Sequence, residues 1–118
     1  MSRNVRFYLE DIQENSLFVL EYTKRMSYKR FTRDTKTVMA TIKHLENIGE
    51  AARHLPQSLK ARYPDVKWDE MIALRNVLVH HYFGINYLLI WATVKDDIPP
   101  LYQRIISILD SEPPVINE

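Results

Sequence analysis

Hydrophobic residues recur along this chain at steps of three and four, and that spacing predicts amphipathic helices. The first helix is expected over residues 5 to about 25, with acidic residues on its outer face. Its apolar face carries Val5, Leu9, Ile12, Val19 and Tyr22. A second long helix is expected from an N-cap at Asp34 or Thr35 to about residue 54. Its apolar seam, spaced as in a coiled coil, consists of Val38, Ile42, Leu45, Gly49 and Ala52.

Small residues on this second helix predict a close contact with another helix. Gly49 lies on the seam and Ala51 lies beside it, so that another backbone can approach closely there. Glu50 is one residue from the seam, and we expect it to be half turned toward whatever packs on that face.

Prolines and one glycine divide the second half of the chain. Pro56 begins a short element that Pro64 ends, and Trp68 begins a helix that Gly84 stops. A fifth element follows, and Pro99-Pro100 is expected to break it and to begin the last helix. The apolar residues that mark these last two elements are Leu88, Trp91, Val94, Ile98, Leu101, Ile105, Ile108 and Leu109.

The pattern contains no internal repeat and no convincing strand. The predicted fold class is therefore all-α, an up-and-down helical bundle with two long helices and three or four shorter ones. We expect a single domain over residues 1–112 and a short C-terminal tail over residues 113–118, because Pro113-Pro114 ends the ordered part.

The composition narrows the function classes. The chain has 118 residues, of which 46% are hydrophobic and 26% charged, as in a folded globular domain. Only two glycines occur, which argues against a glycine-rich phosphate loop. Cysteine is absent, which excludes disulfides and thiolate metal sites. No leader peptide and no run of about 20 apolar residues is visible, so a cytoplasmic protein is expected.

Charge is unevenly distributed although the net charge is only +1. The segment between the two long helices is basic and reads as a frayed helix end plus a loop. Its cations are Lys24, Arg25, Lys29, Arg30, Arg33 and Lys36. A solvated loop is the simpler interpretation, but the segment is also a candidate RNA-binding surface. The end of the chain from Asp96 onward is acidic, and such polarity can steer an anionic ligand to one face.

The strongest chemical pattern is Arg75-x4-His80-x-Tyr82, near the end of the predicted fourth helix. With this composition, chance gives about 0.3 copies of the Arg-His pair and about 0.02 copies of the triple. Arginine is a permanent phosphate clamp, and histidine exchanges a proton near neutral pH. Together they suffice for metal-free phosphodiester transfer in RNA, with a second histidine to protonate the leaving oxygen.

Helix geometry constrains this reading. At about 100° per residue, Arg75 and Tyr82 project within about 20° of each other, whereas Arg75 and His80 are about 140° apart. Either the helix loosens near His80, or two copies of the chain meet across this helix and share one cleft.

A purely structural alternative remains open. Arg75 could pair with Glu70 or Glu50, His80 and His81 could cap the helix end, and Tyr82 could simply pack. His44 and His54 lack acidic partners at metal-ligand spacing, and no His-Glu-x-x-His occurs, so no metal site is predicted.

Several separated motifs, in order, resemble one known family. They are Ile48-Gly49-Glu50-Ala51-Ala52, Trp68, the ten residues from Arg75 to Gly84, and Trp91 and Leu101 on either side of Pro99-Pro100. Over roughly Val5 to Leu109 the chain looks like the HepT-like branch of the HEPN superfamily. One departure is Asn86, where relatives often carry aspartate, which puts a contact of that carboxylate in doubt.

The resemblance implies a helical homodimer across the motif helix and a toxin that cuts RNA without a metal or cofactor, leaving 2′,3′-cyclic phosphate ends. Carried over by residue, Arg75 and His80 are catalytic and Asn76 and His81 support the site. Tyr82 is the residue that a cognate MNT-type nucleotidyltransferase antitoxin modifies with AMP to silence the toxin. The alternative is a non-catalytic module that binds a nucleotide or a partner within a nucleotidyltransferase complex.

Overall fold

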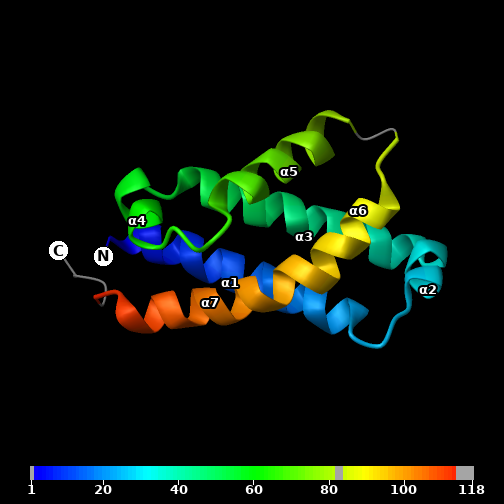
Figure 1. The fold of residues 1–118 in the computed structure, drawn as a ribbon, viewed down its shortest axis with the longest axis horizontal. Helices are drawn as coiled ribbons and strands as arrows, with labels where there is room; N and C mark the ends of the chain where they lie inside the picture. The colour runs from blue at the N-terminus through cyan, green and yellow to red at the C-terminus, as the bar shows by residue number, and fades with distance from the viewer. Residues whose placement is uncertain (1, 82–83, 114–118) are drawn as a thin grey trace.

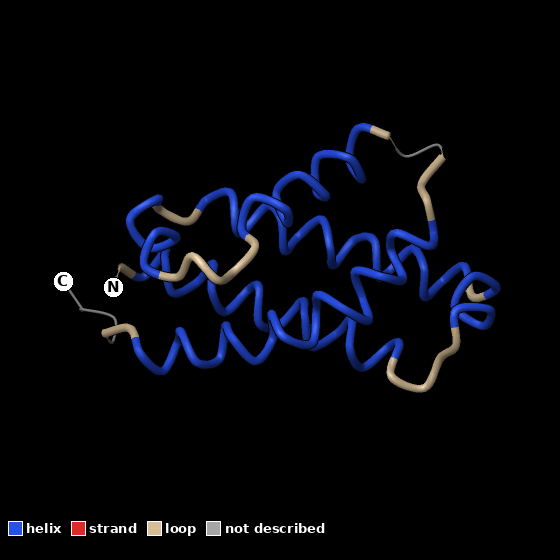
Figure 2. The backbone as a smooth tube through the Cα atoms, in the orientation of Figure 1, coloured by secondary structure: helices blue, strands red, loops and turns tan. Residues whose placement is uncertain are grey.

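The computed structural model describes residues 2–81 and 84–113, and all regular structure in these ranges is helical (Figures 1 and 2). Two long antiparallel helices, α1 and α3, form the centre of the molecule (Figure 1). α7 packs along α1, and α5 packs along α3 on the other side. The predicted all-α class is confirmed for the described part of the chain.

The remaining segments are short and connect these four helices. In chain order the elements are α1 Arg3–Thr23, α2 Tyr28–Arg33, α3 Thr35–His54, α4 Gln57–Arg62, α5 Trp68–His80, α6 Tyr87–Ala92, the π-helical turn η1 Thr93–Asp97, and α7 Ile98–Ser111. The start of α1 and the end of α7 lie at the same end of the molecule, whereas α2 lies at the opposite end (Figure 1). None of the helices in the described ranges is long and apolar enough to cross a membrane.

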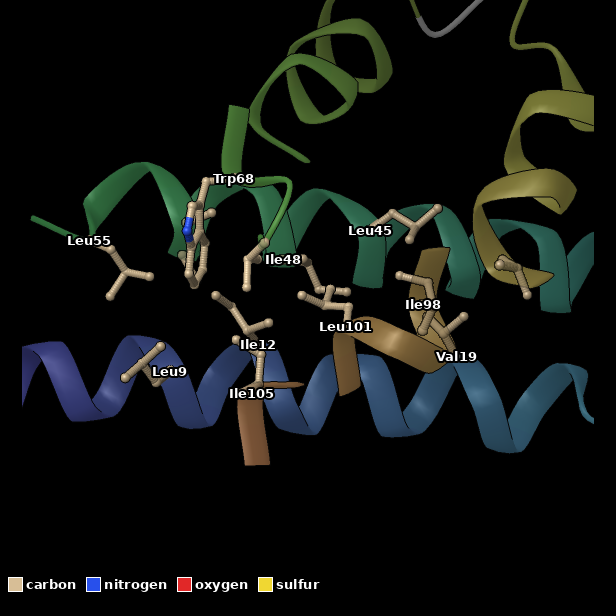
Figure 3. Packing of buried hydrophobic residues seen from close by; sticks show 14 of the residues in the cluster. Leu9, Ile12, Val19, Leu45, Ile48, Leu55, Trp68, Ile98, Leu101 and Ile105 are labelled. Atoms are coloured by element: carbon tan, nitrogen blue, oxygen red, sulfur yellow. The ribbon is translucent and has the colours of Figure 1, made fainter. Parts of the chain in front are cut away.

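The core lies between α1, α3 and α7, where the predicted apolar faces meet (Figure 3). Leu9 and Ile12 of α1 face Ile105 of α7 and Ile48 of α3, and all four side chains are buried. Burying one such side chain stabilises a fold by about 1.5–3 kcal/mol. The three-and-four spacing in the sequence therefore identified most of the residues that hold the bundle together.

The predicted N-cap at Asp34 is confirmed. Its carboxylate accepts a hydrogen bond from the Thr37 backbone N–H at 3.0 Å. That hydrogen bond lowers the pKa of Asp34 below its usual value, because it favours the ionised form. The second long helix thus begins where the local sequence places it.

The basic segment after α1 contains a helix that the sequence did not predict. α2 begins after Ser27, whose hydroxyl accepts a hydrogen bond from the Arg30 N–H at 3.1 Å. Phe31 anchors it, because this side chain is fully buried and its ring lies 5.0 Å from the Trp91 ring. The expectation of a frayed end and a loop was wrong for this stretch, since tertiary burial of one aromatic stabilises the short helix.

The expectation that Pro99-Pro100 begins the last helix is confirmed, because the prolines lie in the first turn of α7, but the expected break before that helix was wrong. α6, η1 and α7 follow one another without a loop. In η1 the Ile98 N–H bonds to the Thr93 carbonyl, a step of five residues instead of four. The prolines then occupy the first turn of α7, where a missing N–H needs no intrahelical partner.

Tyr22, predicted on the apolar face of α1, is 39% exposed. Thr23 takes the buried position instead, and its hydroxyl donates to the Val19 carbonyl at 2.7 Å, which satisfies the polar group inside the protein.

Candidate active site

α5 carries the Arg-x4-His pair and remains helical through both residues. Its first turn contains Asp69 and Glu70, and the helix dipole stabilises negative charge at that end. It ends at His80, and the His81 N–H closes the last turn on the Val77 carbonyl at 2.9 Å. The helix therefore does not loosen to bring His80 toward Arg75, and within one chain the two side chains project about 140° apart.

The backbone of α5 approaches α3 closely at Gly49. A Cβ atom placed on Gly49 would lie 2.3 Å from the Cβ of Arg75 and 2.6 Å from the Met71 carbonyl oxygen. Both distances are far below van der Waals contact, so only glycine permits this crossing. The small residue in the sequence seam is thus the reason why Arg75 lies directly against α3.

The Arg75 guanidinium is held on two sides. Its Nε lies 3.1 Å from Glu50 Oε2, and its Nη1 donates to Asn76 Oδ1 at 2.8 Å. The Arg75 side chain is 24% exposed. No residue in the described ranges bonds to Nη2, and this nitrogen is the donor that an incoming phosphate oxygen can use.

Basic side chains from two helices, α3 and α5, contact the Glu50 carboxylate. Its Oε1 accepts hydrogen bonds from Arg53 Nη2 at 2.8 Å and from His54 Nε2 at 2.9 Å. Its Oε2 accepts a longer one from Arg53 Nε at 3.4 Å and also faces Arg75. The hydrogen bond from Arg53, aided by His54, lowers the pKa of Glu50 to about 2. The carboxylate is consequently ionised at any pH near neutrality. Of the two acidic partners that the sequence offered for Arg75, Glu50 is used, and Glu70 lies 3.9 Å from Lys67 instead.

His80 and His81 are exposed at the end of α5. Within the described ranges no contact joins His80 to Arg75. Tyr82, the predicted modification target, lies outside the described residues. The predicted supporting role of Asn76 now has a geometric basis, because its side-chain oxygen accepts a hydrogen bond from Arg75.

The predicted RNA-binding cations lie around α2 at the end of the molecule remote from the termini (Figure 1). All six are exposed: Lys24, Arg25, Lys29, Arg30, Arg33 and Lys36. Lys24 pairs with Glu21 at 3.1 Å. α2 also contacts α6, the next helix after α5 in chain order.

The other histidines serve helix contacts. His44 Nδ1 donates to Asn15 Oδ1 at 2.7 Å, since Asn15 uses its Nδ2 to donate to the Asp11 carbonyl. Burial lowers the pKa of His44, which keeps the ring neutral in this contact between α1 and α3. No group of three or more potential metal ligands is found in the described ranges.

An apolar groove of about 340 Å³ lies beside α5, between α3, η1 and α7. Its walls include Leu45, Ile48, Met71, Leu74, Ile98 and Leu101. Two of its lining residues are exposed apolar side chains, Val77 at 44% and Leu89 at 48%. On an ideal helix Ala73, Val77 and His80 project within about 60° of one another, so this apolar surface adjoins His80.

The sequence analysis did not predict that Arg53 and His54 both donate hydrogen bonds to Glu50. The signal was present, because residues three and four positions apart on a helix are neighbours. Without the position of α5, however, nothing connected this local cluster to Arg75.

Comparison with known proteins gives one family. The family described as "Ribonuclease HepT-like" matches residues 12–108. A Thermococcus cleftensis protein named "Probable ribonuclease HepT" is 42% identical over 101 residues, which cover 86% of this chain and 92% of that protein. A Methanocaldococcus jannaschii protein named "Putative RNase" is 41% identical over 103 residues, covering 87% and 94%. A second protein of that name and organism is 44% identical over 97 residues, covering 82% and 80%. No solved structure matches significantly.

Proposed function

Because this chain belongs to the HepT-like ribonuclease family, we propose that it is the toxin of a toxin–antitoxin pair and acts as an endoribonuclease. Arg75 and His80 carry the reaction in a cleft between two copies of the chain. The observation that carries the proposal is the state of Arg75: its guanidinium is fixed by Glu50 and Asn76, on the same helix as an exposed imidazole, and no residue in the described ranges bonds to its Nη2.

A second copy is required by the geometry of α5. One chain aims Arg75 and His80 in different directions, so a phosphate held by one Arg75 needs the His80 of another chain. Val79 is an exposed apolar side chain of α5 that projects about 40° from Arg75 and about 100° from His80, so it lies on the side of the helix between them, a surface that a second copy would cover. A two-fold axis near Val79 would bring Arg75 and His80 of both copies to one cleft, which supports a homodimer across α5.

The proposed reaction is transfer of a phosphoryl group within RNA. One His80 takes the proton from a ribose 2′-hydroxyl, and the 2′-oxygen attacks the adjacent phosphorus. Arg75 stabilises the charge of the phosphorane. The bond from phosphorus to the 5′-oxygen then breaks, and the second His80 gives that oxygen a proton. The products are a 2′,3′-cyclic phosphate and a 5′-hydroxyl, and no step calls for a metal ion.

The test is RNA cleavage in EDTA by the wild type, Arg75→Ala and His80→Ala. Loss of an acid–base group costs about 10²–10⁴-fold in rate, and loss of a charge-stabilising donor about 10²–10³-fold. We therefore expect cleavage with cyclic phosphate ends by the wild type and at most traces with either variant. His44→Gln, in the contact between α1 and α3, is the control and should cleave normally. Equal cleavage by all four proteins would remove the proposal.

We also propose that a cognate MNT-type nucleotidyltransferase silences the toxin by transferring AMP to Tyr82. Tyr82 follows His80 by two residues in the sequence. An adenylate there adds a bulky anion that competes with the RNA phosphate for Arg75. After co-expression with the partner, mass spectrometry should find one added adenylate on Tyr82 and none on a Tyr82→Phe variant. An inhibited complex with unmodified Tyr82 would instead indicate inhibition by binding.

A second candidate function is a nucleotide-binding module without catalysis. The observation that favours it is that Arg75 and His80 do not converge within one chain. Such a module would bind a mononucleotide tightly through Arg75 and would leave RNA intact in the experiment above.

A further inference from the structure

Glu50 links the end of α3 to the proposed phosphate clamp on α5. Arg53 donates to both of its carboxylate oxygens, from Nη2 to Oε1 at 2.8 Å and from Nε to Oε2 at 3.4 Å. His54, on the same helix, also donates to Oε1, and Oε2 lies 3.1 Å from Arg75 Nε. The carboxylate is thus oriented from within α3 and reaches across to α5 through Oε2.

Two features make this contact well defined although the Glu50 side chain is 36% exposed. A glutamate side chain has three rotatable bonds, and simultaneous hydrogen bonds from the residues three and four positions ahead restrict them. The crossing at Gly49 fixes the distance between the two helices, since the Cβ of Arg75 leaves no space for a larger residue there. The carboxylate and the guanidinium are therefore both held before any ligand arrives.

We propose that Glu50 is a positioning residue for the proposed cleavage: it holds the Arg75 guanidinium so that Nη2 points to the RNA phosphate. Arg53 and His54 act through Glu50, because they orient its carboxylate without contacting Arg75. The inference rests on the proposed ribonuclease function. It adds Glu50 as a residue that positions Arg75, and it assigns Arg53 and His54 the role of orienting Glu50.

The charge of Glu50 decides what its removal should do. A carboxylate next to an arginine repels the phosphate, so Glu50 cannot strengthen binding of the RNA in the ground state. Its benefit is a preorganised guanidinium, and preorganised charge acts on the transition state. Removal should therefore lower kcat without raising KM, a split that a purely structural ion pair does not produce.

The experiment compares Glu50→Gln with wild type and with the matched control Glu46→Gln. Glu46 lies one turn earlier on α3, and its ion-pair partner is Lys43 at 3.8 Å. For Glu50→Gln we expect kcat to fall about tenfold, with KM for the RNA unchanged or lower. Glu46→Gln should retain both constants. A wild-type kcat for Glu50→Gln, or a loss that appears only as a higher KM or as unfolding at the assay temperature, overturns the proposal.

A second readout does not depend on cleavage. Nitrogen-15 relaxation of Arg75 Nε, assigned by the loss of its signal in Arg75→Lys, should report a rigid side chain in wild type and in Glu46→Gln, and a mobile one in Glu50→Gln. A mobile Arg75 side chain in the wild type overturns the positioning role whatever the enzyme assay shows. A rigid Arg75 in a protein that does not cut RNA would uphold the fixed guanidinium and reject the ribonuclease.

Discussion

At the scale of single residues, Gly49 decides whether the candidate site forms. A glycine inside a helix destabilises it by about 0.5–1 kcal/mol relative to alanine, so a buried helical glycine calls for a reason. Here the reason is the Cβ of Arg75 and the Met71 carbonyl, which would lie within 2.6 Å of an added Cβ. The glycine weakens α3 by itself but lets α5 bring Arg75 within reach of Glu50.

The variant Gly49→Ala separates the effect of helix propensity from that of the contact with α5, because the two change the free energy of unfolding in opposite directions. Helix propensity alone predicts a gain in unfolding free energy of about 1 kcal/mol. The clash with the α5 backbone predicts a loss of about 1–3 kcal/mol, since neither contacting atom is the end of a flexible side chain. We expect the clash to dominate, giving a net loss of up to about 2 kcal/mol in urea unfolding. A net gain in stability would mean that α5 can move away from α3 freely.

At the scale of elements, the sequence predicted the long helices well and the short ones less well. α1 and α3 agree with prediction to within about two residues, because many apolar positions repeat along them and Asp34 marks a boundary. α2 was missed because its six residues contain a single buried side chain, Phe31. One residue gives no periodicity, and the burial of that residue depends on Trp91, far away in the sequence.

Pro99 and Pro100 led to the opposite error: the sequence predicted a break in the helical path, but the structure has none. Proline lacks an N–H and its ring clashes with the carbonyl four residues earlier, which normally ends a helix. The π-helical turn from Thr93 to Asp97 widens the helix just before Pro99 and Pro100, so that the chain continues into α7. Sequence rules for helix ends assume α-helical geometry on both sides, and that assumption fails here.

At the scale of the whole molecule, the charged segments lie apart along an elongated shape. The molecule measures 48 × 29 × 25 Å, with the basic residues of α2 at one end and the start of α1 and the end of α7 at the other (Figure 1). At that second end Glu112 is engaged by Arg62 at 2.6 Å and by the Tyr63 hydroxyl at 2.8 Å. That the basic end guides a polyanion toward the exposed end of α5 stays a prediction.

The oligomeric state is the prediction that belongs to this scale. Val79→Glu places a charge on the exposed side of α5 between Arg75 and His80, and we expect it to convert the proposed dimer into a monomer in light scattering after gel filtration. RNA cleavage should be lost with it, because His80 and Arg75 no longer share a cleft. Leu17→Glu, at a similarly exposed apolar position on α1, is the control and should remain a dimer. A monomeric wild type that cleaves RNA would refute the shared cleft.

The sequence alone determined what depends on neighbours along the chain: the helical class, the main helix boundaries, and the Arg-His pair on one helix with its unfavourable angle. These features follow from residue spacing, because helix geometry converts sequence separation directly into direction. Only the tertiary structure decided that Arg75 meets Glu50 and not Glu70, that Arg53 and His54 join them, and that α2 forms at all. Those contacts depend on how two helices cross, and the crossing is fixed by atoms that are distant in the sequence, above all by the space that Gly49 leaves empty.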